Sequence, residues 1–121
     1  LSVTSPSTVI ELRGDGGDYE LTKWRLDAVD LGIPRATMTD LSGGDAAFNA
    51  DAIRSVLGGE IGPHRDIGVL NAAAALVVAG HAFDLVGGLA IANESLDSGA
   101  AKAVLDRMVA ISLSAASGTP V

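Results

Sequence analysis

The chain has 121 residues, of which 48% are hydrophobic and 3% aromatic, and its formal net charge is −7. This length predicts one domain, and the acidic balance argues against nucleic acid and membranes as partners, because an acidic surface repels phosphate. The absence of cysteine excludes disulfides and thiolate metal sites, and it is compatible with a cytoplasmic location.

Residues 1–25 are predicted to form a β-hairpin. Residues 3–12 are rich in Val, Thr and Ile, residues 14–17 supply a glycine-rich turn, and residues 19–24 alternate imperfectly between apolar and polar. Pro6 either confines the first strand to a sheet edge or delays its start. We interpret Tyr19 and Trp24 as packing anchors.

Residues 26–44 are predicted to form a loop, because Gly32 and Pro34 prevent a long helix there. Residues 45–114 then carry the period of about four helices, and residues 115–121 form a tail. The helix boundaries are predicted from N-caps at Asp45 and Asp84, a first turn at Pro63, stops at Gly58-Gly59 and Gly80, and a restart at Ser98-Gly99.

The second helix is apolar nearly all round between residues 67 and 79, so it should be central and buried. This run is too short to span a bilayer, and it is interrupted by Asn71. We expect the Asn71 amide to bond a neighbouring backbone, with the lining of a pocket as the alternative. The start of the chain lacks the features of a signal peptide and an initiator Met, so we expect Leu1 to belong to a longer polypeptide.

Several polar residues invite a functional interpretation, and each has a structural one that we favour. Gly43-Gly44-Asp45 could attract an anion at a helix start, but the motif fits an N-cap better. His64 and His81 lack an orienting partner at ligand spacing, so we interpret both as surface or capping residues.

The remaining polar candidates are also too common in pattern to define a site. Glu94 and Asp97 are three residues apart on a predicted helix, and the hydroxyl residues near the start lack a nucleophile motif. The Gly58-Gly59 and Gly87-Gly88 pairs fit helix ends or close packing. We therefore assign no catalytic, cofactor-binding or metal-binding residue. The hydroxyl residues are Ser2, Thr4, Ser5, Ser7 and Thr8.

Five blocks, in order and spacing, resemble the C-terminal part of the α/β domain of anthranilate phosphoribosyltransferases. Residues 1–12 resemble the strand after that family's metal-binding Asp-Glu pair, and Leu-Gly-Ile-Pro-Arg-Ala resembles its Phe-Gly-Leu-Pro-Arg-Ala loop. Asp-Ser-Gly-Ala-Ala resembles the restart before its last helix. The blocks are residues 1–12, 31–36, 43–50, 62–76 and 97–101.

The resemblance implies an α/β fold in the intact protein, whereas this stretch alone reads as α+β. It implies an enzyme of tryptophan biosynthesis that joins anthranilate to the ribose of phosphoribosyl pyrophosphate, with magnesium, as a homodimer. The family's Gly-Thr-Gly-Gly-Asp loop, Lys-His-Gly-Asn segment, anthranilate-contacting arginine and Asp-Glu pair are absent here. The magnesium ligands would lie upstream of Leu1, near residues 1–8.

We therefore expect a C-terminal fragment that supports the active-site half, depends on the remainder of its polypeptide as its partner, and is inactive alone. One alternative is a non-catalytic binding or interaction module of the same fold. Another is a relative of the nucleoside phosphorylases, which share the fold and the phosphate chemistry.

Overall fold

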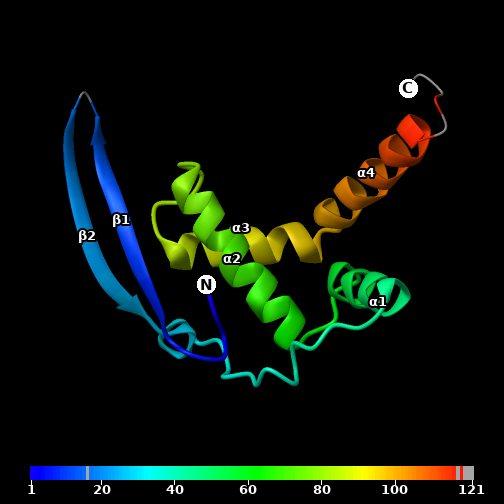
Figure 1. Cartoon of the computed structure of the whole chain (residues 1–121), viewed down its shortest axis with the longest axis horizontal. Helices are drawn as coiled ribbons and strands as arrows, with labels where there is room; N and C mark the ends of the chain where they lie inside the picture. The colour runs from blue at the N-terminus through cyan, green and yellow to red at the C-terminus, as the bar shows by residue number, and fades with distance from the viewer. Residues whose placement is uncertain (16, 117, 119–121) are drawn as a thin grey trace.

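The structure is a computed structural model that describes residues 1–15, 17–116 and 118. A two-stranded hairpin lies on one side, two crossed helices occupy the middle, and two further helices lie on the other side (Figure 1). This order confirms the predicted hairpin followed by about four helices. The elements are β1 (Ser7–Asp15), β2 (Asp18–Leu26), the 3-10 helix η1 (Ala28–Leu31), α1 (Ala46–Leu57), α2 (Pro63–Val78), α3 (Leu85–Asp97) and α4 (Ala100–Ala116).

The hairpin is antiparallel, and its register runs from Ser7 opposite Leu26 to Asp15 opposite Asp18. The first strand begins at Ser7 rather than at residue 3, so of the two effects considered for Pro6 the delayed start is the one observed. The preceding residues form a turn instead, in which the Thr4 amide donates to Ser2 Oγ at 3.1 Å. The second strand continues to Leu26, one residue past the predicted hairpin.

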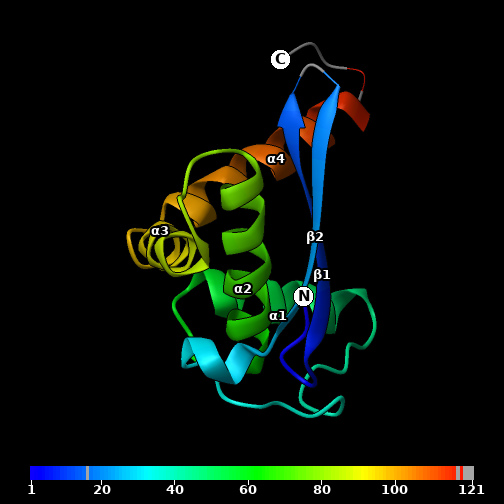
Figure 2. The ribbon, with the colours of Figure 1, turned by 90° about the vertical axis from the view of Figure 1, so that its left-hand side faces the viewer.

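The interpretation of Tyr19 and Trp24 as packing anchors is wrong for this chain. Their exposed fractions are 63% and 39%. The hairpin diverges from the helices beyond its base (Figure 1), and its tip rises past the end of α2 in the rotated view (Figure 2). The outer half of the hairpin therefore has no element to pack against among the described residues.

The predicted loop contains one short helix, η1, and no long one. The Asp27 side chain accepts from the Val29 amide at its start, and Gly32 ends it with a φ of 79°, a left-handed conformation that suits glycine. The chain then passes along the core, where the Ala36 amide donates to the Val3 carbonyl at 3.1 Å. This bond ties the loop to the N-terminal segment.

The helix boundaries follow the predicted capping chemistry. Asp45 Oδ1 accepts from the Phe48 amide at 2.9 Å, and Asp84 Oδ1 accepts from the Gly87 amide at 2.8 Å. Pro63 is the first residue of α2. The last helix continues to Ala116, two residues past the predicted end. Of the predicted tail, residues 117 and 119–121 lie outside the described residues.

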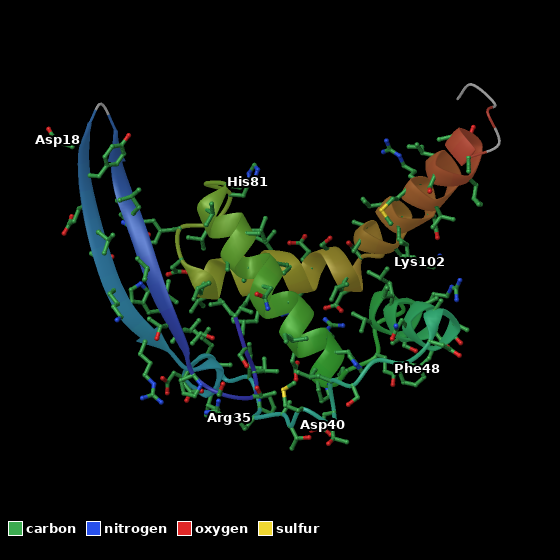
Figure 3. All side chains as sticks on the ribbon, viewed as in Figure 1. Asp18, Arg35, Asp40, Phe48, His81 and Lys102 are labelled. Carbon is green, nitrogen blue, oxygen red and sulfur yellow. The ribbon has the colours of Figure 1, made fainter. Side chains whose placement is uncertain are left out.

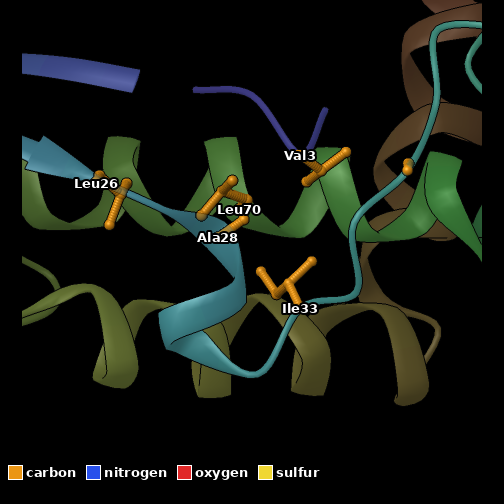
Figure 4. Close-up of a cluster of buried hydrophobic side chains, with 6 residues drawn as sticks. Val3, Leu26, Ala28, Ile33 and Leu70 are labelled. Atoms are coloured by element: carbon orange, nitrogen blue, oxygen red, sulfur yellow. The ribbon is translucent and has the colours of Figure 1, made fainter. Parts of the chain in front are cut away.

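The core is small and lies where the base of the hairpin, the loop and α2 meet (Figure 4). The two largest side chains that are completely buried belong to Val3 and Leu70. The cluster is completed by small and branched residues, as the low aromatic content requires. Its buried members are Val3, Leu26, Ala28, Ile33, Ala36 and Leu70.

Helix α2 is central, as predicted, but it is buried over only part of its surface. Its buried residues are Val69, Leu70 and Ala73. These lie on the faces covered by the N-terminal segment and by α3, where Gly88 packs directly against Ala73. The other faces of α2 remain open because the described elements cover one part of its circumference.

Candidate functional site

The Asn71 side chain holds the first residue of the chain against α2. Its Nδ2 donates to the carbonyls of Leu1 and Ile67, both at 2.9 Å, and its Oδ1 accepts from the Leu1 nitrogen. The expected bond between this amide and neighbouring backbone is therefore confirmed. Because Val3 is completely buried two residues later, residues 1–3 are fixed on both sides.

The hydroxyl residues after Leu1 bond to one another and to nearby backbone. Ser2 Oγ lies 2.9 Å from Thr4 Oγ1, and Ser7 Oγ accepts from the Ser2 amide at 3.0 Å. Ser5 and Thr8 are exposed. This arrangement shapes a turn, which agrees with the structural interpretation of these residues.

A second polar pair lies below the core, at the start of η1. Arg35 donates from Nη2 to both carboxylate oxygens of Asp27, at 2.7 and 2.6 Å. The hydrogen bond from Arg35, followed by that from the Val29 amide, lowers the pKa of the Asp27 carboxyl. The pair fixes the loop after the hairpin. Figure 3 labels Arg35 at this lower edge of the molecule.

A third cluster joins α2 to α3 and was missed by the sequence analysis. Arg65 Nη2 donates to Asn93 Oδ1 at 2.8 Å and to Asp97 Oδ1 at 2.7 Å, and the Arg65 side chain is only 11% exposed. Asp97 thus pairs with Arg65 rather than forming an acid–base pair with Glu94. A signal was present, because a cation in the first turn of a helix opposes the helix dipole and needs an acidic partner.

A shallow cleft opens beside this cluster, between residues 31–34, α2 and α3. Asp66 and Asn93 supply its polar groups, and Val69 and Leu89 are among its apolar walls. Burial raises the pKa of the Asp66 carboxyl, and the neighbouring Arg65 charge opposes this shift. A single carboxylate beside an amide that already bonds Arg65 and the Leu89 carbonyl does not form an acid–base pair.

The glycine-rich start of α1 is closed by its own side chains. Asn49 Oδ1 accepts from the Gly44 amide and Asn49 Nδ2 donates to the Gly44 carbonyl, both at 2.9 Å. Asp45 caps the helix, as predicted. The Gly44 amide, which an anion would need, is therefore already bonded.

The two histidines lie at opposite ends of α2. His64 is half-buried in the first turn, and His81 is exposed just after the helix, where its amide donates to the Leu76 carbonyl (Figure 3). Within the described ranges, no group of three or more His, Cys, Asp or Glu side chains could hold a metal ion. The described residues therefore do not fit a magnesium site. None of the described helices has the length and apolar character needed to cross a membrane.

Comparison with known proteins places the chain among glycosyl transferases. A family model described as "Glycosyl transferase family, a/b domain" matches residues 1–102. An anthranilate phosphoribosyltransferase of Rhodopseudomonas palustris (strain TIE-1) is 45% identical over 115 residues, which are 95% of this chain and 33% of the relative. One of Methylobacterium nodulans is 47% identical over 112 residues, 93% of this chain and 32% of the relative.

A solved structure agrees with these matches. The crystal structure of anthranilate phosphoribosyltransferase (TrpD) from Thermus thermophilus superposes with a TM-score of 0.70 at 32% identity, covering 86% of this chain and 35% of that one. The resemblance noted from the sequence is thereby confirmed. The chain spans about a third of the length of these relatives. By its match along most of its length, the chain belongs to the glycosyl transferase family defined by this a/b domain.

Proposed function

We propose that this chain is a supporting part of an α/β domain that transfers the phosphoribosyl group of phosphoribosyl pyrophosphate to anthranilate, in the cytoplasm and in tryptophan biosynthesis. The main support for this proposal is the 45% identity, over 95% of the chain, to a protein named anthranilate phosphoribosyltransferase. The absence of a legible acid–base pair among the described residues favours a supporting role over a catalytic one.

The contribution of the described residues is rigidity. Asn71 and Ala36 hold residues 1–3 from two sides, while Arg65 ties α2 to α3. A reaction that depends on placing two substrates in line loses rate steeply when the supporting wall shifts by about 1 Å. These bonds therefore support catalysis without touching a substrate.

In this proposal, the substrate contacts, the magnesium site and the contacts of a homodimer lie in the part of a full-length relative that this chain does not match, about two thirds of its length. The described residues contain no suitable metal cluster, and the relatives are about three times as long as this chain. The chain alone should therefore be inactive.

The test is a pair of assays for phosphoribosyl anthranilate formation. Both assays monitor the reaction through the loss of anthranilate fluorescence. The 121-residue chain alone should give no turnover. A chimera, in which this chain replaces the matching third of the R. palustris relative, should give turnover well above a control that lacks this third.

Three results would contradict the proposal in different ways. Turnover by the isolated chain would overturn the supporting role. A folded chimera without turnover would favour the non-catalytic module. A folded chimera that cleaves nucleosides with phosphate, but ignores anthranilate, would favour the nucleoside phosphorylase relative.

A further inference from the structure

Two asparagines of this chain bind backbone in the same way but over very different distances in the sequence. Asn49 bonds both the amide and the carbonyl of Gly44, five residues earlier, at the start of its own helix. Asn71 bonds both the nitrogen and the carbonyl of Leu1, which is 70 residues away. The first contact shapes a local turn, whereas the second fixes a distant segment against α2.

The Asn71 side chain is oriented by hydrogen bonds although it is exposed. Its Nδ2 donates to the Ile67 carbonyl, one turn earlier in α2, at 2.9 Å. With one Nδ2 hydrogen held there, the other hydrogen and Oδ1 serve Leu1. Because alanine favours a helix more than asparagine does, α2 itself does not need this side chain. The contact with Leu1 is therefore its specific contribution.

Leu1 is held through its backbone and its side chain together. Both of its backbone polar groups bond Asn71, and its side chain packs against the buried core. Two residues later, Val3 is completely buried, and its carbonyl accepts from the Ala36 amide at 3.1 Å. The start of the chain lies beside α2, on the side toward the hairpin (Figure 1). Both the position and the direction of the backbone at Leu1 are therefore fixed.

We propose that Asn71 is a positioning residue for phosphoribosyl transfer, because it sets the direction in which the preceding polypeptide joins this chain at Leu1. The inference rests on the proposed function, in which the substrate contacts lie in the part of a relative that this chain does not match. Since the resemblance places this chain in the C-terminal part of the domain, that part is joined to it through Leu1. Consecutive Cα atoms are about 3.8 Å apart, so a change of direction at Leu1 passes directly to the residue before it.

A peptide bond before Leu1 makes the contact with Asn71 more directional. In this chain the Leu1 nitrogen is the terminal ammonium, which has several hydrogens to donate. A peptide nitrogen has one N–H, so donation to Asn71 Oδ1, together with the bond from Nδ2 to the Leu1 carbonyl, orients both peptide planes that meet at Leu1. Asn71 thus takes the place of one residue of a neighbouring strand, which would exchange the same two bonds.

The experiment compares the steady-state kinetics of the chimera described above in four forms. These are the unsubstituted chimera, Asn71→Ala, Asn71→Gln and Asn49→Ala. Asn49→Ala is the matched control, because it removes the same two kinds of backbone bond without touching Leu1. Asn71→Gln keeps the amide on a longer side chain. Each form is assayed at least about 15 °C below its unfolding midpoint, so that a smaller folded fraction does not lower the rate.

Asn71→Ala should lower kcat at least roughly tenfold and leave the KM of each substrate within about twofold, because the alignment of bound substrates affects the rate more steeply than their binding. Asn49→Ala should change kcat by less than about twofold, and Asn71→Gln should recover at least about a third of the unsubstituted kcat. Equal losses in the two alanine variants would overturn the proposal, as would a raised KM at unchanged kcat. A loss in Asn71→Gln as large as that in Asn71→Ala would overturn the role of the amide.

Hydrogen exchange separates this proposal from the proposed function. In the chimera, the Leu1 amide should exchange at least roughly tenfold faster after Asn71→Ala and at an unchanged rate after Asn49→Ala. This result without any turnover would defeat the proposed function and keep Asn71 as the residue that positions the junction. Turnover in which neither kcat nor the exchange of Leu1 responds to Asn71→Ala would do the reverse.

The isolated chain tests the proposal even if the chimera does not fold. A Gly-Gly extension before Leu1 turns the terminal nitrogen into a peptide N–H. The Leu1 amide should then exchange roughly fivefold faster after Asn71→Ala than after Asn49→Ala. Equal rates in these two variants would overturn the proposal.

Discussion

The core and the outer hairpin both contain leucine, but the leucine side chain is buried in the core and exposed on the hairpin. Leu70 is 0% exposed at the centre, whereas Leu21 on the hairpin is 65% exposed. Both belong to well-formed elements, so local structure does not explain the contrast. Leu70 has neighbours from the N-terminal segment, the loop and the base of the hairpin, while Leu21 has its own hairpin. Apolar side chains therefore favour burial in both regions, but tertiary contacts determine which of them are buried within this chain.

The strongest way to break this comparison is to truncate one leucine in each region. Leu70→Ala should lower the free energy of unfolding by about 2–5 kcal/mol, because it removes buried contacts and leaves a cavity. Leu21→Ala, the matched control, should cost less than about 0.5 kcal/mol in the isolated chain, as expected for an exposed position. Urea denaturation followed by circular dichroism measures both. Equal losses would show that Leu21 is buried in solution.

The contact between α2 and α3 offers a comparison between two helical glycines. A Cβ on Gly88 would lie 2.7 Å from the Ala73 carbonyl oxygen and 2.9 Å from its Cα, so Gly88→Ala should force the helices apart at a cost of about 1–3 kcal/mol. A Cβ on Gly68 would meet nothing within 4 Å. Gly68→Ala should therefore stabilise the chain by about 0.4–1 kcal/mol, since alanine loses less entropy on folding.

Thermal unfolding of both glycine variants measures this difference. A stabilised Gly88→Ala would mean that α2 and α3 cross less closely than the structure shows. A destabilised Gly68→Ala would mean that another element covers α2 at that position.

The local features of the fold were predictable because their causes lie within a few residues. Asp45 and Asp84 cap helices through amides three residues away, and the glycine-rich turn closes a hairpin of the expected kind. These interactions depend on local sequence and elementary stereochemistry, so a single sequence carries the information.

The features that the sequence did not reveal depend on distant partners. Arg65 bonds Asp97 across 32 positions, and Tyr19, interpreted as an anchor, remains 63% exposed on the outer hairpin. The burial predicted for α2 is incomplete for the same reason, because an apolar run indicates that a helix needs neighbours but does not identify them. Several of the polar side chains that the sequence singled out bond one another or nearby backbone, as Asp97 does with Arg65 and Asn49 with Gly44, and form no catalytic pair.

The attachment of residues 1–3 to the core depends on one amide. Asn71→Ala removes the bonds to Leu1 and should cost about 1 kcal/mol, which would accelerate exchange of the Ala36 amide, bonded to Val3, roughly fivefold. Hydrogen exchange followed by NMR measures this rate. Asn49→Ala is the control, because Asn49 bonds the Gly44 backbone and should leave Ala36 unchanged. Equal exchange in both variants would assign the docking of the segment to Val3 alone.

Asp27, which pairs with Arg35, and Asp66, which is partly buried, should affect the stability of the chain with opposite pH dependence. The Arg35 bond lowers the pKa of Asp27 below 3.8, so Asp27 stabilises the fold above that pH, and this stability is lost as pH falls through the lowered pKa. Burial raises the pKa of Asp66 above 3.8, so stability falls as pH rises from 3.8 through the raised pKa. At neutral pH, Asp27→Asn should therefore destabilise the chain and Asp66→Asn should stabilise it. Both differences should shrink in acid, as urea midpoints across the pH range would show, and a stabilising Asp27→Asn would mean that the Arg35 pair contributes nothing in solution.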